Sequence, residues 1–402
     1  MVDGLLIRAR RLPAPLWILL VYAAARLVTT LFLLAAADLS GPTSRFGADA
    51  TIGTLTLGWD AQWYWYVAVH GYPTVLPLTA SGAVAENQWA FLPVYPYVSA
   101  AVGAVLGSWG AGAVVVSLLA GYGACLALYA LLRDRLDTSG RMWAVAFFAA
   151  GPLAALFQVG YAEMLFLFLL LLALDCLQRR RFGWLYALIP VMGFTRPGIL
   201  AFALLLGLFG LWRLRRRAQE PLHRPEVIHI IALGALASVV GFAWQLIAGI
   251  ATGDAGAYLA TELAWRRNWI PDSTAHFVPF EGFVTAAAFW FTAWGLPAWL
   301  GYVVLAVVVV AVAALLLFEP HVRRLGVVVR LWSASYLLYL LAVFFPQSSV
   351  FRLLLPLTPL AGAVAAGRAL WWRIGVLALG LVGQWWWIYN MYALANTYWQ
   401  IP

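Results

Sequence analysis

Residues 59–73 read WDAQWYWYVAVHGYP, so that one carboxylate, Asp60, lies among six aromatic rings before the stretch ends on a Gly-Tyr-Pro turn. In a helix, Asp60 and Tyr64 share one side, because residues four apart lie one turn above each other. Trp and Tyr side chains favour the headgroup level of a bilayer. The stretch therefore predicts a helix that lies flat on a membrane surface and holds a carboxylate at the mouth of a membrane bundle.

The composition around this stretch is that of a membrane protein. Of the 402 residues, 64% are hydrophobic and 10% are charged, whereas roughly a quarter of the residues in soluble proteins are charged. Apolar runs near the ~20 residues that cross a bilayer recur along the chain. We therefore expect an all-α polytopic membrane protein that forms one domain over 1–402. The net charge of +9 follows membrane topology and does not indicate a nucleic-acid partner.

Apolar runs divide the chain into candidate spans. A tight turn, Thr195-Arg196-Pro197-Gly198, joins two short ones. Irregular backbone is not tolerated against lipid, so we expect this turn to lie in protein or to line a cavity, with Arg196 either buried there or placed as an outer-face cation. The eleven candidate spans are 16–37, 112–132, 142–158, 161–178, 183–195, 198–212, 227–250, 297–318, 327–345, 351–367 and 374–392.

Segment 91–107 is also apolar, and the arginine distribution indicates whether it crosses. If it does not cross, 19 arginines fall on the cytoplasmic side and 5 on the outer side, with Arg26 in mid-span. If it crosses, nearly all later clusters face outward, against the positive-inside rule. We therefore expect a re-entrant or interfacial helix kinked by its prolines, the N-terminus inside, the C-terminus outside, and two large outer loops at 38–111 and 251–296.

The distribution of acidic residues favours chemistry at the outer surface. No carboxylate falls clearly at mid-membrane, where ion-coupled transporters usually keep theirs. The sequence has no DxD motif, no metal-ligand spacing, no phosphate-binding loop and no Ser-His-Asp pattern. What remains is a set of outer-face carboxylates near outer-face arginines. Together these groups could deprotonate an acceptor hydroxyl and stabilise a departing phosphate.

Several sequence blocks resemble the PIG-V family, whose eukaryotic member is the second mannosyltransferase of glycosylphosphatidylinositol assembly. The likeness covers most of residues 16–367, and the first two blocks are its specific part. Ala162 and Met164 depart from the family, which prefers hydroxyl residues there. The blocks are Trp59-Asp60-Ala61…Ala68…His70-Gly71-Tyr72, Glu86…Ala90-Phe91-Leu92-Pro93…Pro96, Gly151-Pro152…Tyr161-Ala162-Glu163…Leu165-Phe166, Thr195-Arg196…Gly198 and Arg352…Leu355-Pro356…Pro359-Leu360.

The resemblance implies a GT-C fold and an enzyme that moves a sugar, most often mannose, from a polyprenyl-phosphate donor on the non-cytoplasmic side. It implies that Asp60 is the catalytic carboxylate. We expect an acceptor hydroxyl on a glycolipid, glycan or protein, the plasma membrane of a bacterium as the location, and neither a cofactor nor an essential metal. The residues expected to bind substrate are Trp59, Tyr64, Glu86, Tyr161, Glu163, Arg196 and Arg352.

Other interpretations stay open at this stage. Asp60 and Glu163 are also explained as acids in the first turn of a helix, and outer arginines also snorkel. Arg26 needs a partner that the sequence does not name. His276 and the Arg266-Arg267-Asn268-Trp269 run of the second outer loop are expected on a wet loop surface, with contact to the acceptor as the alternative. A lipid-sugar flippase would use Arg26 and Arg196 along a path and tolerate Asp60→Asn, and a membrane scaffold would need no site. Arabinose or glucose could replace mannose.

Overall fold

The computed structural model describes residues 12–267, 269, 277–397 and 399–402, and in these residues the chain is helical without a strand. The predicted all-α class is confirmed. The N-terminal arginines at 8, 10 and 11 lie outside the described residues. In chain order the helices are α2 (Ala14–Asp38), α3 (Ile52–Thr56), α4 (Asp60–His70), η1 (Gln88–Ala90), α5 (Val94–Leu106), α6 (Trp109–Leu131), α7 (Thr138–Ala149), η2 (Ala154–Phe157), α8 (Glu163–Gln178), α9 (Phe182–Gly193), α10 (Ile199–Arg215), α11 (Arg224–Thr252), α12 (Ala257–Arg267), α13 (Glu281–Ala293), α14 (Ala298–Phe318), α15 (Pro320–Arg324), α16 (Val327–Val343), α17 (Val350–Leu353), η3 (Leu355–Leu360), α18 (Ala361–Ala365), α19 (Leu370–Ile388) and the π-helix η4 (Tyr389–Leu394).

Within the described residues, four helices are long and apolar enough to cross a membrane: α2, α6, α11 and α14. Shorter apolar helices at α5, α9, α16 and 355–365 fill the space among them. These helices support an integral membrane protein, because about 20 apolar residues are needed for a full crossing. The count of eleven spans stays a prediction.

The predicted span 142–158 is not one continuous helix. Helix α7 ends at Ala149, and Gly151 and Pro152 separate it from the 3-10 turn η2. The Arg26 guanidinium donates to the carbonyl of Ala149 and, at 2.8 Å, to that of Ala154. The partner of this mid-span arginine is therefore the backbone of the broken helix, whose carbonyls would otherwise lack hydrogen bonds inside the bundle.

The predicted span 351–367 is also broken. It divides into α17, η3 and α18, because Pro356 and Pro359 cannot continue an α-helix. Side chains of α16 take up the freed carbonyls: Trp332 donates its indole N–H to the Pro356 carbonyl at 2.7 Å, and Tyr336 donates to the Leu353 carbonyl at 2.8 Å. The segment that carries Arg352 is thus an irregular backbone held by a packed helix.

Helix α5 lies beside the first part of α6. The Tyr95 hydroxyl donates to the Ala113 carbonyl at 3.0 Å, and a Cβ at Gly112 would approach the Ser99 carbonyl oxygen to 2.2 Å, so only glycine permits this contact. With 13 residues, α5 is shorter than the ~20 residues of a crossing. Length alone does not separate a re-entrant helix from a span, because α9, in a predicted span, has only 12 residues, so the re-entrant helix stays a prediction.

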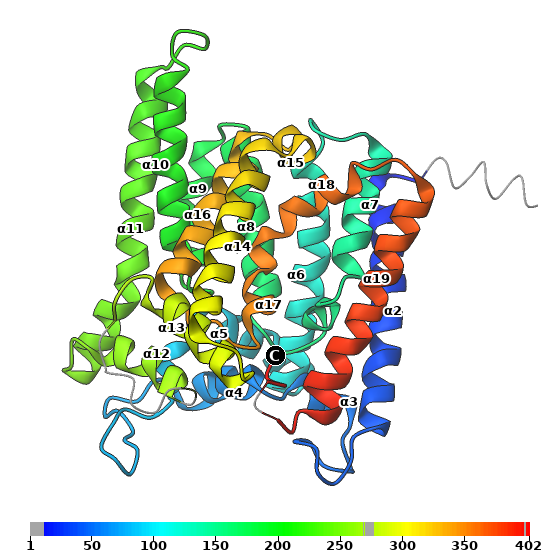
Figure 1. The fold of residues 1–402 in the computed structure, drawn as a ribbon, viewed down its shortest axis with the longest axis vertical. Coiled ribbons are helices and arrows are strands. Elements are labelled where there is room, and N and C mark those ends of the chain that lie inside the picture. The colour runs from blue at the N-terminus through cyan, green and yellow to red at the C-terminus, as the bar shows by residue number, and fades with distance from the viewer. Residues whose placement is uncertain (1–11, 268, 270–276, 398) are drawn as a thin grey trace, which may run out of the picture.

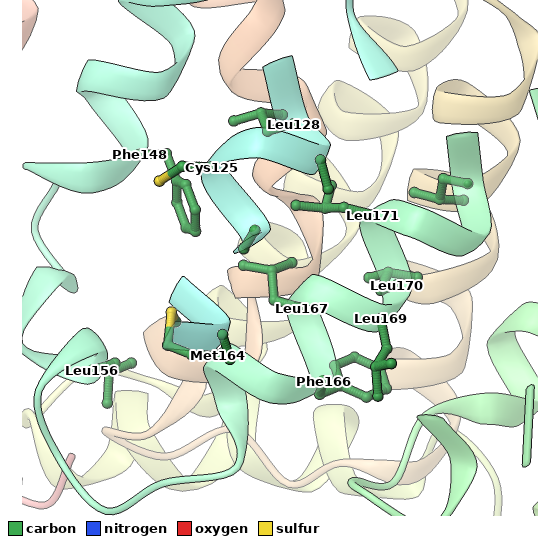
Figure 2. Packing of buried hydrophobic residues seen from close by; sticks show 14 of the residues in the cluster. Cys125, Leu128, Phe148, Leu156, Met164, Phe166, Leu167, Leu169, Leu170 and Leu171 are labelled. Atoms are coloured by element: carbon green, nitrogen blue, oxygen red, sulfur yellow. The ribbon is translucent and has the colours of Figure 1, made fainter. Parts of the chain in front are cut away.

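Helix α8 forms the centre of the bundle and is buried along most of its length. Figure 2 shows Leu167 and Leu171 of α8 in one hydrophobic cluster with Cys125 and Leu128 of α6. Since α8 begins at Glu163, this packing fixes the position of a carboxylate at one end of the bundle.

Predicted cytoplasmic and outer segments lie at opposite ends of the molecule. Helices α15 and α18 lie at the upper end in Figure 1, and α3, α4, α12 and α13 lie at the lower end. Two arginines predicted as cytoplasmic pair with acids of the connection between α6 and α7: Arg179 with Asp134 at 3.5 Å and Arg368 with Asp137 at 3.6 Å. The two predicted outer loops contribute the helices at the lower end, which the sequence assigns to the non-cytoplasmic side.

Candidate active site

The site begins at Trp59, which precedes α4 in a backbone conformation that L-residues rarely adopt, with φ 56° and ψ −127°. Two contacts hold it there. Its indole Nε1 donates to the Met391 carbonyl at 2.9 Å, and the Arg45 guanidinium lies 4.1 Å above its ring. Strained backbone persists only where the surroundings over-determine it. The predicted helix therefore begins one residue later than Trp59, at Asp60.

Asp60 occupies the first turn of α4, where the helix dipole favours a carboxylate. Its backbone N–H donates to the Tyr161 hydroxyl at 3.3 Å. Its carboxylate accepts a hydrogen bond from Arg352. The Asp60 side chain keeps 28% exposure, so it is held in place yet still reaches solvent.

Glu163 lies behind Arg352 and connects the two arginines. Its Oε1 is 3.2 Å from Arg352 Nη1 and 3.4 Å from Arg196 Nη2. The side chain is only 2% exposed, and the Arg352 guanidinium lies 5.2 Å over the Tyr161 ring. We call this series of ion pairs, Asp60–Arg352–Glu163–Arg196, the ion-pair chain. The negative charges of its two acids formally cancel the positive charges of its two arginines.

Arg196 is buried in the turn between α9 and α10, as expected for irregular backbone in protein. Gly198 adopts φ 134° in this turn, a conformation open to glycine. The Thr195 hydroxyl donates to the Val191 carbonyl at 2.6 Å and closes the end of α9. Of the two alternatives for Arg196, the structure shows the buried one, paired with Glu163.

Two buried polar atoms of the ion-pair chain have no hydrogen-bond partner within the described residues: Glu163 Oε2 and Arg352 Nε. A buried polar atom left unpaired costs about 1–3 kcal/mol, and such exceptions usually have a functional or solvent explanation. The Arg352 Nε–H is a donor, which suits an anionic oxygen.

Two predicted substrate-binding residues are not members of the ion-pair chain, although the charges of Glu163 and Asp60 act on the Tyr64 hydroxyl. Tyr64 is buried with its ring 5.1 Å from those of Phe91 and Tyr95, and burial raises the pKa of its hydroxyl well above the ordinary value. Glu86 is half-buried before η1, and among the described residues the ion pairs around Arg352 do not include it. Substrate contact by Tyr64 and Glu86 stays a prediction.

The structure adds a region that the sequence did not indicate. The π-helix η4 brings the Met391 carbonyl to Trp59 and places the buried Tyr392 beside Tyr161. Helices of this kind often occur at functional sites. Hydrophobic periodicity carries no signal for a π-helix, and η4 lies more than 300 residues from Trp59 along the chain, so no local pattern linked them.

The expectation of a wet loop surface was wrong for Arg266, while Asn268 and His276 lie outside the described residues. Arg266 does not lie on a wet loop surface: its side chain is 12% exposed and pairs with Glu281 at 3.3 Å, and its guanidinium lies 5.6 Å from the Phe345 ring centroid. The residue is thus part of the packing between α12 and α13. Over the described residues, no group of three or more His, Cys, Asp or Glu could hold a metal ion.

Comparison with known proteins gives likeness only to solved structures. No family model matches the chain, and no curated protein matches it. The archaeal oligosaccharyltransferase AglB from Archaeoglobus fulgidus, in complex with an inhibitory peptide and a dolichol-phosphate, is 14% identical with a TM-score of 0.44 over 94% of this chain and 56% of that chain. The Archaeoglobus fulgidus oligosaccharyltransferase complex with Zn and sulfate is 13% identical, with a TM-score of 0.44 over 92% of this chain and 52% of that chain. The chain spans about half the length of these proteins, and a likeness of this size does not assign a function. Membership of the PIG-V family stays a prediction.

Proposed function

We propose that the chain is a PIG-V-like glycosyltransferase of GT-C fold that moves mannose from a polyprenyl-phosphate-mannose donor to an acceptor hydroxyl on the non-cytoplasmic face. The observation that carries this proposal is the ion-pair chain. It places a solvent-reaching carboxylate, Asp60, directly against a buried arginine, Arg352, at the end of the bundle that the arginine count assigns to the outside.

The donor phosphate would bind by exchanging partners with Asp60. Arg352 is shared between Asp60 and Glu163, and Glu163 is much the less exposed of the two acids. A phosphate oxygen that accepts hydrogen bonds from Arg352 and Arg196 would therefore displace Asp60 rather than Glu163, because the guanidinium fork suits phosphate. Glu163 keeps both arginines in position, and Asp60 becomes free as donor arrives.

The transfer then needs one base and one cationic site. The free Asp60 carboxylate takes the proton of the acceptor hydroxyl as the hydroxyl oxygen bonds to the anomeric carbon. The bond between that carbon and the phosphate oxygen breaks, and its electron pair stays on the phosphate, where Arg352 and Arg196 stabilise the added charge. Attack from the face opposite the phosphate inverts the anomeric carbon, so a β-linked donor gives an α-linked product.

The alternative function as a flippase loses the support of one of the two arginines that were expected to line a transport path. Arg26 is buried and donates to the Ala149 and Ala154 carbonyls, so in this conformation it closes a helix break and lines no path. Arg196 remains available to either function. A flippase would move the lipid-linked sugar without forming a glycosidic bond, and this difference separates the two functions.

The test is transfer of labelled mannose from synthetic polyprenyl-phosphate mannose by the purified protein and its Asp60→Asn variant. We expect the variant to lose about 10²–10⁴-fold in turnover, the usual contribution of a general base, with donor binding retained. Asp49→Asn is the matched control, since Asp49 is an exposed acid of the same outer loop. Equal turnover by wild type and Asp60→Asn would contradict the role of Asp60, and flipping in liposomes without bond formation would favour the rival.

A further inference from the structure

A concave site lies outside the residues of the ion-pair chain. It is a cavity of about 470 Å³, within the range of small-molecule pockets. It opens between α12, α13, the loop that precedes α17 and the C-terminal residues. Its lining is mostly aromatic, with one amide side chain, and consists mainly of Trp265, Trp269, Phe289, Trp290, Ala293 and Gln347. We call it the aromatic pocket.

The aromatic pocket is built on the same elements as the ion-pair chain. On one side, the Trp265 ring contacts Trp63 with centroids 5.9 Å apart, and Trp63 follows Asp60 by about one turn of α4. On the other side, the Gln347 carbonyl accepts the Val350 N–H at 2.9 Å and starts α17, the helix of Arg352. The pocket lining is therefore connected to the two helices that carry the proposed base and the proposed phosphate ligand.

The lining of the aromatic pocket includes no member of the ion-pair chain. Trp63, three residues and about 4.5 Å of helical rise after Asp60, links α4 to the pocket through its contact with Trp265. A sugar ring whose hydroxyl touches Asp60 is therefore not the ring that the pocket lining would hold. The pocket is in position for the next unit of a longer acceptor.

The chemistry of the lining suits a neutral sugar ring. Aromatic faces carry negative charge density, on which the slightly positive C–H face of a sugar stacks. The Gln347 amide donates one N–H to the Ser349 hydroxyl at 3.3 Å and keeps a second N–H and its carbonyl oxygen for sugar hydroxyls. The nearby Arg266 is neutralised by Glu281 at 3.3 Å. A lipid chain could not hydrogen-bond the Gln347 amide, and the described lining has no charged side chain that would attract a charged ligand.

We propose that the aromatic pocket binds a second, neutral sugar ring of the acceptor, one unit beyond the ring that carries the attacking hydroxyl. This inference rests on the proposed glycosyl transfer and adds to it the class and minimum length of the acceptor, a glycan of at least two rings. Energy from this remote contact would appear in kcat/KM for the longer acceptor.

The test compares one-ring and two-ring acceptors, methyl α-mannoside and methyl α-dimannoside, with the same donor. Wild type is expected to prefer the two-ring acceptor at least tenfold in kcat/KM. Ala293→Phe fills the pocket, and Gln347→Ala removes its amide. In both variants we expect the ratio of kcat/KM for the two-ring acceptor to kcat/KM for the one-ring acceptor to fall close to one, with the kcat/KM for the one-ring acceptor unchanged. Thr292→Phe adds the same ring at an exposed neighbouring position of α13 and is expected to behave as wild type.

The outcomes separate this inference from the function on which it rests. A wild type that transfers mannose without preference for two rings, or an Ala293→Phe variant that keeps the preference, overturns the aromatic pocket alone. Transfer to a Ser/Thr peptide but to neither mannoside also overturns it. If no donor is cleaved, the proposed function fails, and saturation-transfer NMR then decides the pocket. Contact of the second dimannoside ring, lost in Ala293→Phe, supports it, and the lack of such contact in wild type refutes it.

Discussion

Arg352 Nη1 lies 3.2 Å from Glu163 Oε1, and the same nitrogen donates to Asp60. One guanidinium thus joins a buried acid from α8 to a partly exposed acid from α4. The buried acid holds the arginine in place, and the exposed acid is the partner that can be exchanged. This asymmetry gives the site a resting state and a state ready for donor.

Arg352→Lys keeps the positive charge but removes the planar guanidinium, whose remaining N–H groups would bind the donor phosphate while Nη1 faces the acids. We expect donor affinity to fall at least tenfold and turnover to fall further, because the leaving phosphate loses a directed donor. Binding of polyprenyl phosphate by the purified protein, measured beside labelled-mannose transfer, checks both effects. Wild-type donor affinity in Arg352→Lys would remove Arg352 from phosphate binding.

Glu163→Gln leaves Arg196 and Arg352 buried without their shared acid. Breaking a buried ion pair by removing one partner costs about 3–5 kcal/mol, so we expect a clear fall in the thermal midpoint in detergent. A double-mutant cycle with Arg196→Gln measures the coupling, which we expect to reach about 1 kcal/mol for residues in direct contact. Additive effects of the two substitutions would show that the ion pair contributes nothing.

Arg26→Met is expected to destabilise the protein without a catalytic defect. The change leaves the Ala149 and Ala154 carbonyls without their donor inside the bundle, and each unpaired group costs about 1–3 kcal/mol. Turnover per folded molecule should stay within about twofold of wild type. The control is Arg133→Met, because Arg133 is exposed in the turn that follows α6. Lost transfer or lost transport at unchanged stability would instead give Arg26 a functional role.

Glu262→Gln should raise stability at neutral pH and change little in acid. Burial raises the pKa of Glu262 from 4.5 to about 7, although a hydrogen bond from Tyr258 opposes the shift. The folded state thus keeps this proton where the unfolded state has lost it. The stabilising contribution is complete below pH 4.5 and disappears as pH rises to about 7. Thermal midpoints at pH 4.5 and 8 should therefore differ from wild type by about 2 °C or more only at pH 8. An equal effect at both values would contradict the shifted pKa.

The sequence predicted the components of the site better than their connections. Counting arginines placed Arg196 and Arg352 on the same side as Asp60 and Glu163, because charge bias records topology directly. It could not show that one guanidinium bridges two acids, since that depends on the broken segment from α17 to α18. The helix breaks inside the predicted spans 142–158 and 351–367 were missed for a related reason: both segments are apolar, and hydropathy does not register a helix break that tertiary contacts satisfy.

The partner of Arg26 was hidden from sequence reasoning for a different reason. Side-chain complementarity can be sought among acidic residues, but Arg26 binds backbone carbonyls, which every position provides. Similarly, the contact between Trp59 and Met391 depends on a π-helix that has no periodic signature. Contacts to backbone, and irregular helices, are the parts of the site that only the folded chain shows.

The arginine within α2 also imposes an order on biosynthesis. Ala149 and Ala154 emerge from the ribosome more than a hundred residues after Arg26, so the first helix enters the membrane before its acceptors exist. A centrally placed arginine costs about 2.5–3.5 kcal/mol on insertion, which the apolar remainder of α2 must offset by itself. Until α7 has entered the membrane, the Arg26 guanidinium needs other hydrogen-bond partners, such as water, lipid headgroups or the insertion machinery. The hydrogen bonds of Arg26 can therefore form only once the chain has been synthesised as far as η2, and the ion-pair chain can form only after Arg352 has followed.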